Sequence, residues 1–397
     1  MKVDKSKWVE STLGYCLISL RTGLNPRLNF KLNEPGSNNY YITVRELNGR
    51  GLTITDKTDK FPDYAFPLIN NRSNLEVGDV LFTGTGTIGK TALVSETPQN
   101  WNIKEGVYAL KPNSELIDSE YLLHYLHSIN LMEFCRVNSK GATIQSVPMA
   151  TLKKAPIILP PLDKQQGIAK ELDTLQIMID GYKAQIADLT ELAKSLFLDM
   201  FGDPIINDKG WENKLLSKVG NFARGVSTHR PRNAPELLGG IMPLIQTGDI
   251  ANAGMYITKH SKTYSELGVK QSKVWSAGTL CITIAANIGK CSILKFEACF
   301  PDSVVGYIPN NNFVYNEYLF YVFERLQSIM EANAPGVAQK NINLAYLNSL
   351  QVPLPPIELQ KEFISKINCI EKQKELLCEQ LTDEEQLMSE RMQYYFS

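Results

Sequence analysis

Two long segments of the chain carry apolar side chains at alternating spacings of three and four residues. In the first segment, residues 164–200, these positions are Ile168, Leu172, Leu175, Ile179, Tyr182, Ile186, Leu189, Ala193, Leu196 and Met200. In the second segment, which follows residue 356, they are Phe363, Ile367, Ile370, Leu377, Leu381 and Met388. This spacing is typical of a coiled-coil seam. Because Lys374 and Glu384 also fall on the second seam, we expect the second helix to be the less regular partner.

The same two segments have clear predicted boundaries. Each follows a Leu-Pro-Pro, at 159–161 and 354–356, and proline fits the first turn of a helix but not its interior. Gly202 and Pro204 predict the end of the first helix. Since such apolar stripes need a partner in water, we expect the helices to pack on each other as an antiparallel coiled coil. Roughly 36 residues would make a spacer about 54 Å long. A dimerisation stalk is the alternative.

The remaining pattern mixes short strands with shorter helices. Residues 79–83 and 279–283 read as buried strands that enter glycine-containing turns. Helical periodicity is present at 118–132 and 315–330. Strand-turn segments are expected at 40–47 and 242–250, and loops rich in Asn, Pro, Gly and Arg at 24–40 and 226–240. The expected fold class is therefore α+β.

The chain repeats itself at a distance of about 200 residues. Residues 75–94 and 275–294 share Gly78/Gly278, Thr83/Thr283 and the Ile-Gly-Lys of 88–90 and 288–290, and Glu-Tyr-Leu recurs at 120–122 and 317–319. Such repetition indicates a pseudo-twofold architecture. We expect globular domains at 1–155 and 206–350, joined by helical segments at 156–205 and 351–397.

Composition narrows the class of protein. The 397 residues are 43% hydrophobic and 21% charged, which is typical of a soluble globular protein. No apolar run suits a membrane helix, the first residues lack a signal-peptide core, and the seven cysteines form no C-x-x-C pair, so we expect a cytoplasmic protein. The globular segments have net charges of +3 and +4, and the helical segments −4 each. The basic excess is compatible with a phosphate-backbone partner.

One motif resembles a nucleotide-binding loop. Residues 84–91, GTGTIGKT, match G-x-x-x-x-G-K-[ST]. In the second copy, however, Ile284, Ala286 and Cys291 replace the first glycine, the middle glycine and the threonine. The residues after Lys90 are also β-like, whereas a phosphate loop needs a following helix. One interpretation that suits both copies is a tight turn that requires glycine. The functional one is a turn that presents Lys90 and Lys290, with Thr85, Thr87 and Asn287, to a polyanion.

Other polar loops supply further candidate contacts. Lys140 and Gln145 are matched in the second copy by Gln339 and Lys340. Arginines of the early loops are similar candidates, because arginine is the commonest reader of guanine: Arg45, Arg224, Arg230 and Arg232. These are also ordinary loop residues. His124 and His127 are three residues apart without a third ligand, so no metal site is expected. The sequence shows no catalytic motif, which favours recognition over catalysis.

Together, these features resemble the specificity subunit of type I restriction–modification systems. The resemblance rests on two divergent halves that each end in Leu-Pro-Pro-[LI], with Gln165 and Gln360 at the helix starts, and on SLFLDMFGDP at 195–204 before Trp211, which mirrors Trp8. It covers essentially the whole chain. It implies two target recognition domains that read a split double-stranded DNA sequence, separated by spacer helices.

The resemblance also implies partners. The helices would dock two modification (methyltransferase) subunits, and the complex would recruit restriction subunits. Those partners would bind S-adenosylmethionine and ATP, and this chain would bind neither. Because the recognition domains diverge most in this family, the candidate DNA contacts come from loop chemistry and not from a matched motif. Two alternatives stay open: a nucleotide hydrolase or kinase that uses GTGTIGKT, and a coiled-coil adaptor with two protein-binding heads.

Overall fold

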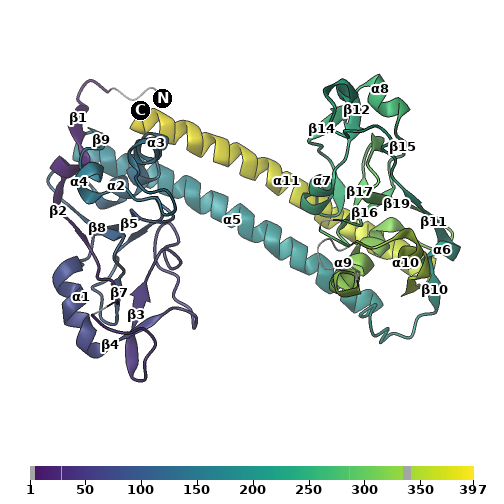
Figure 1. The fold of residues 1–397 in the computed structure, drawn as a ribbon, viewed down its shortest axis with the longest axis horizontal. Coiled ribbons are helices and arrows are strands. Elements are labelled where there is room, and N and C mark those ends of the chain that lie inside the picture. The colour runs from purple at the N-terminus through teal and green to yellow at the C-terminus, as the bar shows by residue number, and fades with distance from the viewer. Residues whose placement is uncertain (1–4, 28, 286, 334–340) are drawn as a thin grey trace. The chain divides into compact units, whose positions relative to one another are not determined.

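The computed structural model describes residues 5–27, 29–285, 287–333 and 341–397, and it divides into two compact units. Unit 1 comprises Met1–Lys183 and Glu379–Ser397, and unit 2 comprises Ala184–Cys378. Two helices of 40 residues each, α5 (Leu162–Phe201) and α11 (Ile357–Phe396), contribute a segment to both units (Figure 1). Each unit is therefore built from one globular part of the chain and one portion of each long helix.

Unit 1 contains nine strands in the part of the chain that the structure describes. A four-stranded sheet has the order β2-β8-β5-β6, a three-stranded sheet has the order β4-β3-β7, and β1 pairs with β9. The strands are β1 (Val9–Thr12), β2 (Leu17–Thr22), β3 (Ser37–Ile42), β4 (Lys60–Pro62), β5 (Val80–Thr83), β6 (Thr91–Leu93), β7 (Trp101–Ile103), β8 (Val107–Pro112) and β9 (Pro156–Leu159). The helices are α1 (Phe66–Ser73), α2 (Ser119–Leu126), α3 (Ile129–Asn138) and α4 (Met149–Leu152), with short 3₁₀ turns at Leu13–Cys16 and Asp63–Ala65.

Unit 2 repeats this plan with a larger main sheet. Its sheets have the orders β11-β19-β16-β17-β13, β14-β12-β18-β15 and β10-β20. The strands are β10 (Asn213–Leu215), β11 (Gly220–Arg224), β12 (Leu238–Leu244), β13 (Tyr256–Ile257), β14 (Lys262–Tyr264), β15 (Val274–Trp275), β16 (Leu280–Thr283), β17 (Cys291–Leu294), β18 (Ala298–Cys299), β19 (Val304–Pro309) and β20 (Gln351–Pro353). The helices are α6 (Leu216–Val219), α7 (Thr247–Asn252), α8 (Glu266–Lys270), α9 (Asn316–Asn333) and α10 (Leu344–Ser349), with a 3₁₀ turn at Pro235–Leu237.

The two units share a strand order, which confirms the repeat expected from the sequence. The order β2-β8-β5-β6 corresponds to β11-β19-β16-β17, and all three neighbouring pairs in each set are antiparallel. The strand that leads into each Leu-Pro-Pro pairs with the first strand of the same globular part: β9 pairs with β1, and β20 pairs with β10. The expected α+β class with two repeated domains and two long helices is thus present.

Within each unit the two long helices run antiparallel. In unit 1, the Tyr395 hydroxyl donates to Glu171 Oε2 (2.6 Å), and Lys183 pairs with Glu385 (2.8 Å). Residue numbers on α11 therefore fall as those on α5 rise, which is the antiparallel arrangement. In unit 2, the Phe363 ring at the start of α11 lies 5.1 Å from the Phe201 ring at the end of α5. On the predicted seam, the buried side chains are Ile168, Leu172, Leu175, Ile179, Ala193, Phe363, Ile367 and Ile370, and the half-buried ones are Tyr182, Ile186, Leu189, Leu196, Met200, Leu377, Leu381 and Met388.

Two predictions about the helices need comment: the charged residue Lys374 on the second seam, and the helix expected at 118–132. Lys374, on the second seam, forms an ion pair with Glu371 on the same helix (2.9 Å). The helix expected at 118–132 is two helices, because Ser128 interrupts it and its hydroxyl caps α3 by accepting from the Leu131 amide (3.3 Å). No helix in the described ranges is long and apolar enough to span a membrane.

Candidate nucleic-acid interface

The glycine-containing turn of unit 1 is held by the buried Thr83 at the end of β5. The Thr83 hydroxyl donates to the Thr87 carbonyl (2.6 Å) and accepts from the Lys90 amide (2.9 Å), and the Gly89 amide donates to the Thr83 carbonyl (3.0 Å). Gly89 has a φ of +97°, and a Cβ there would lie 2.5 Å from Met132 Cε of α3. This position therefore requires glycine on both backbone and packing grounds.

The second copy forms the same turn with different neighbouring residues. The Thr283 hydroxyl donates to the Asn287 carbonyl (2.5 Å), and the Gly289 amide donates to the Thr283 carbonyl (2.9 Å). Gly289 has a φ of +79°, and a Cβ there would lie 2.8 Å from Met330 Cε of α9. The shared Ile-Gly-Lys thus has a structural explanation: it builds a tight turn that packs on a helix and leads into the next strand.

Replacing Gly89 with alanine tests this explanation. We expect Gly89→Ala to lower the free energy of unfolding by about 2–3 kcal/mol, because left-handed backbone strain adds to the displacement of Met132. Gly86→Ala is the matched control: Gly86 also has a positive φ (+81°), but a Cβ there meets nothing within 4 Å. The control should cost only about 1 kcal/mol by strain alone. Equal losses in urea unfolding would contradict the packing argument.

The segment after Lys90 does not form a phosphate loop. A phosphate loop places its ligand at the N-terminus of a helix that directly follows the loop. Here β6 (Thr91–Leu93) follows, and it pairs antiparallel with β5, so the chain turns back into the sheet. The β-like character expected for this segment is confirmed, and the turn lacks the helix that nucleotide binding needs.

In both units a second chain segment is hydrogen-bonded to the residue that opens the turn. In unit 1, the Val147 amide donates to the Gly84 carbonyl (2.8 Å), and the Gly84 amide donates to the Gly106 carbonyl (2.9 Å). In unit 2, the Ile342 amide donates to the Ile284 carbonyl (3.1 Å), and the Ile284 amide donates to the Ser303 carbonyl (3.1 Å). We call this shared arrangement the clasp. It places the polar loop that ends at Gln145 next to the loop that contains Thr85 and Thr87.

Most predicted contacts on these loops are exposed. Thr85, Thr87, Lys90, Lys140, Gln145 and Asn287 are exposed, and Lys290 is half-buried. The ammonium groups of Lys90 and Lys140 form no ion pair with any residue that the structure describes. Gln145 instead holds its own loop, since its amide donates to the Gly141 carbonyl (2.8 Å) and accepts from the Ser139 hydroxyl (2.7 Å). Gln339 and Lys340 lie outside the described residues.

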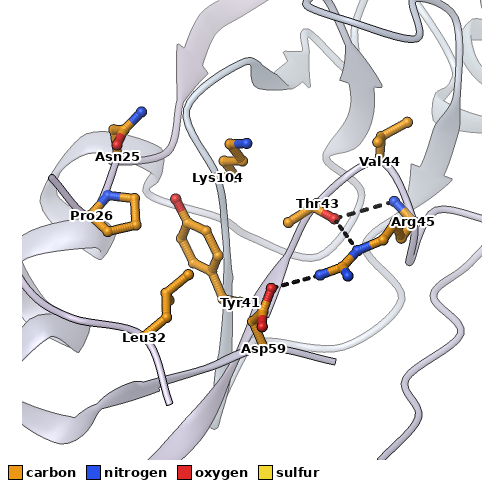
Figure 2. A pocket seen from close by; sticks show the side chains of 9 residues that line it. All are labelled: Asn25, Pro26, Leu32, Tyr41, Thr43, Val44, Arg45, Asp59 and Lys104. Carbon is orange, nitrogen blue, oxygen red and sulfur yellow. Dashed lines mark hydrogen bonds and ion pairs between the residues drawn. The ribbon is translucent and has the colours of Figure 1, made fainter. Parts of the chain in front are cut away.

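Arg45 lies at the edge of a hollow of about 490 Å³ (Figure 2). Its guanidinium pairs with Asp59 (2.6 Å) and donates to the Thr43 hydroxyl (3.4 Å). Hydrogen bonds from Asn33 and Arg45 hold the pKa of Asp59 below its usual value, so the pair stays charged. In Figure 2, the ring of Tyr41 and the side chain of Lys104 lie between Arg45 and Pro26. The hollow is lined by Asn25, Pro26, Leu32, Tyr41, Thr43, Val44, Arg45, Asp59 and Lys104.

Three predicted arginines of unit 2 lie around one residue, Asp302. Arg224 Nε donates to the backbone carbonyl of Asp302 (2.6 Å), and Arg232 Nη2 lies 2.7 Å from the Asp302 carboxylate. Arg230 Nη1 donates to the Ser227 carbonyl (2.6 Å), and its Nη2 lies 3.7 Å from Asp302. Sequence reasoning missed Asp302, because it is about 70 to 80 residues distant along the chain and belongs to no motif.

A polar junction, also missed, ties each globular part to a long helix. In unit 1, Arg50 pairs with Asp173 of α5 and with Glu120 (3.1 Å), and His124 Nε2 lies 2.7 Å from Asp173. In unit 2, the Tyr256 hydroxyl contacts Asn368 of α11 (3.2 Å) and Glu317 (3.4 Å). Glu120 and Glu317 occupy the same place in the repeated Glu-Tyr-Leu, so the two junctions correspond although their chemistry differs.

His124 and His127, the two histidines of α2 and its C-terminal end, each contact a protein side chain. His124 contacts Asp173, and His127 Nε2 lies 2.6 Å from the Thr91 hydroxyl. Burial lowers the pKa of His124, although its hydrogen bond to Asp173 opposes this. Among the residues that the structure describes, no three His, Cys, Asp or Glu side chains are grouped as metal ligands.

Comparison with known proteins gives a consistent result. A family model described as "Type I restriction modification DNA specificity domain" matches residues 5–191 and again 208–384. The chain is 26% identical to a putative type I restriction enzyme MjaX specificity subunit of Methanocaldococcus jannaschii over 75% of this chain and 72% of that protein. It is 25% identical to the type I restriction enzyme EcoBI specificity subunit of Escherichia coli over 61% of this chain, which spans about 56% of that relative.

Solved structures share the fold. The crystal structure of a type I restriction-modification system S subunit from M. genitalium matches with a TM-score of 0.63 at 14% identity, covering 100% of this chain and 98% of the other. A chain from a study of complex assembly and conformational transition of the type I R-M system matches with a TM-score of 0.54 at 17% identity, covering 98% and 97%. At these identities the likeness concerns the fold alone.

Proposed function

Since the chain belongs to the type I restriction modification DNA specificity family, we propose that it is a non-catalytic specificity subunit whose two repeats each read one part of a split double-stranded DNA target. One observation supports this most: the clasp occurs in both units with the same backbone hydrogen bonds. The exposed side chains around it differ between the units, as two readers of different sequences require. A shared scaffold with divergent surface chemistry is what a bipartite reader needs.

The division of labour follows the repeat. We assign residues 1–155 and 206–350 as the target recognition domains, and residues 156–205 and 351–397 as spacer segments that fix the gap between the half-targets. A straight helix of 40 residues is about 60 Å long, which exceeds one turn of duplex at roughly 34–36 Å. Helices of this length therefore suit half-targets that are more than one turn apart.

The long helices also offer surfaces for protein partners. Both carry exposed apolar side chains away from the seam, such as Ile177 (72% exposed) and Leu376 (52%). Their segments are acidic, with a net charge of −4 each, and this disfavours contact with DNA. We assign these surfaces to two modification (methyltransferase) subunits, to which restriction subunits are added. S-adenosylmethionine and ATP would be bound by these partners. All seven cysteines are free, as suits a cytoplasmic complex.

Lys90 and Lys290, the lysines of the two turns, are expected to contact phosphate groups of the DNA backbone. Lys90→Ala and Lys290→Ala should each weaken binding to all sequences similarly, and each should reduce the slope of log affinity against log salt by about 1, because one phosphate contact is lost. Titrating the assembled complex with duplex DNA at several salt concentrations measures both slopes. Lys218→Ala, which removes an exposed cation from α6, is the control. ATP binding that only Lys90→Ala abolishes would instead support the nucleotide-hydrolase reading.

Selection of DNA from a random library tests the proposal directly. The chain, assembled with its modification subunits, should enrich a motif of two short specific parts separated by a fixed number of unspecified base pairs. Enrichment of a single uninterrupted motif would contradict the bipartite assignment. If the complex assembles but enriches no sequence, the protein-binding adaptor is the better reading.

A further inference from the structure

The repeat allows the same point of the fold to be compared in both units. β2 ends at Thr22 and is followed by Gly23, and β11 ends at Arg224 and is followed by Gly225. Both glycines lie against backbone, since a Cβ would collide with the Ile103 carbonyl at Gly23 and with the Pro301 carbonyl at Gly225. The chain therefore leaves the two sheets in the same way, and Thr22 corresponds to Arg224.

Asp302, the acidic residue beside Arg224, also has a counterpart in unit 1. In the clasp, Gly106 and Ser303 accept the equivalent hydrogen bonds from Gly84 and Ile284, so the residue before each of them corresponds as well. That residue is Glu105 in unit 1 and Asp302 in unit 2. The arginine cluster of unit 2 is defined as Arg224, Arg230, Arg232 and Asp302. Two of its members, Arg224 and Asp302, thus occupy positions that exist in both repeats.

The side chains at this position differ completely between the units. In unit 1, Thr22 is buried and turned inward, with its hydroxyl donating to the Val107 carbonyl (3.0 Å) and accepting from the Gly106 amide (3.1 Å). Nearby, Asn25 and Lys104 line the hollow that Figure 2 shows. In unit 2, the corresponding position carries Arg224, which is exposed, as are Arg230 and Arg232 beside it. An identical scaffold with unlike side chains marks a point where the two repeats select different sequences.

Charge and hydrogen bonding show which side chain of the cluster is available to a ligand. The cluster holds three guanidinium groups and one carboxylate, which leaves about two positive charges uncompensated within it. Arg232 is engaged by the Asp302 carboxylate, and Arg230 by the carbonyls of Ser227 and His229. Arg224 uses only Nε, to the Asp302 carbonyl, and its two terminal nitrogens bond to no residue that the structure describes. The guanidinium of Arg224 is therefore held at Nε, while its two terminal nitrogens can donate to a ligand.

We propose that Arg224 reads a guanine in the half-target bound by unit 2, and that the backbone carbonyl of Asp302 positions its guanidinium. This rests on the proposed function. A pair of terminal N–H groups matches the O6 and N7 acceptors that guanine presents in the major groove. A guanidinium anchored at Nε loses little freedom on binding, which favours a directional base contact over a diffuse phosphate contact. Arg230 and Arg232 add positive charge that attracts the duplex without reading it.

A coupling experiment with modified DNA tests the proposal. The complex of the full chain with its modification subunits is titrated with the wild-type target and with targets in which each guanine of the unit 2 half is replaced in turn by 7-deazaguanine, which lacks the N7 acceptor. At one guanine, we expect the replacement to weaken wild-type binding by roughly 5- to 150-fold and to have no further effect on Arg224→Ala. Lys218→Ala should behave as the wild type at every position.

Two further variants separate base reading from charge. Arg224→Lys keeps the charge but not the paired donors, so it should lose discrimination at the same guanine as Arg224→Ala does. Asp302→Asn removes the negative charge of the cluster but keeps the backbone carbonyl that holds Arg224, so discrimination at that guanine should be retained. Intact recognition of the unit 1 half-target by each variant shows that the complex is folded and assembled.

The other outcomes overturn specific statements. If Arg224→Lys restores binding, and Arg224→Ala lowers affinity equally for all sequences, Arg224 is a phosphate contact and the base-reading proposal is wrong. If 7-deazaguanine weakens the wild type and Arg224→Ala equally at every guanine of that half-target, the base-reading proposal is also wrong. A wild-type complex without any sequence preference would instead contradict the proposed function itself.

Discussion

Replacing Gln165 with leucine is expected to lower the free energy of unfolding by about 3–5 kcal/mol. Gln165 is fully buried in the first turn of α5. Its amide group donates to the carbonyls of Leu116 (2.9 Å) and Pro160 (2.8 Å), and its oxygen accepts from the Asp118 amide (2.9 Å). Leucine has a similar size but leaves all three backbone groups without this partner, and each unsatisfied group costs about 1–3 kcal/mol.

The control for Gln165 lies on the same helix. Gln176→Leu removes a half-buried glutamine whose amide donates only to the side chain of Asp180 (2.9 Å), so it should change the free energy of unfolding by less than about 0.5 kcal/mol. Urea unfolding followed by circular dichroism measures both variants. A loss at Gln165 that is no larger than the loss at Gln176 would show that the glutamine does not tie the helix to its globular part.

Truncating Phe363 to alanine is expected to destabilise unit 2 by about 3–5 kcal/mol. Its ring is fully buried, with centroids 5.1 Å from Phe201, 5.8 Å from Phe197 and 5.5 Å from Tyr321. All three contacts are edge-to-face, which adds to the area buried. The substitution would leave a cavity where α5, α9 and α11 meet, and a core this rigid collapses only in part.

Leu376→Ala provides the comparison for Phe363. Leu376 lies on the same helix but is 52% exposed, so its truncation should cost less than about 0.5 kcal/mol. Thermal unfolding of both variants distinguishes a seam residue from its exposed neighbour. Similar melting temperatures for the two variants would contradict the antiparallel packing that the structure shows in unit 2.

Local patterns in the sequence predicted the long helices, the repeat and the tight turns. A three-four spacing or a Leu-Pro-Pro acts within a few residues, so it can be read without knowing the fold. The repeat added further information, because the loss of Ile284 and Cys291 from the phosphate-loop pattern argued against nucleotide binding. The repeated Gln165 and Gln360 also have matching roles: Gln360 donates to Phe313 and Pro355 and accepts from the Tyr315 amide (3.0 Å).

The arrangement of the candidate site could not be predicted in the same way. Asp302 is 78 residues from Arg224, and Asp173 is 123 residues from Arg50. Such contacts depend on sheet order and on the packing of α5, neither of which leaves a local pattern. The break between α2 and α3 was missed for a different reason: Ser128 is a capping residue inside an otherwise continuous helical periodicity, and its local effect prevailed.

Single-molecule sequencing of methylated bases tests the central claim most directly. A cell that expresses this chain with its modification subunit is compared with the same cell without this chain. We predict a split methylated motif that appears only when the chain is present. Exchanging residues 1–155 or residues 206–350 for those of a relative should change one half of the motif and leave the other. Unchanged methylation in the presence of a modification subunit shown to be active would contradict the assignment.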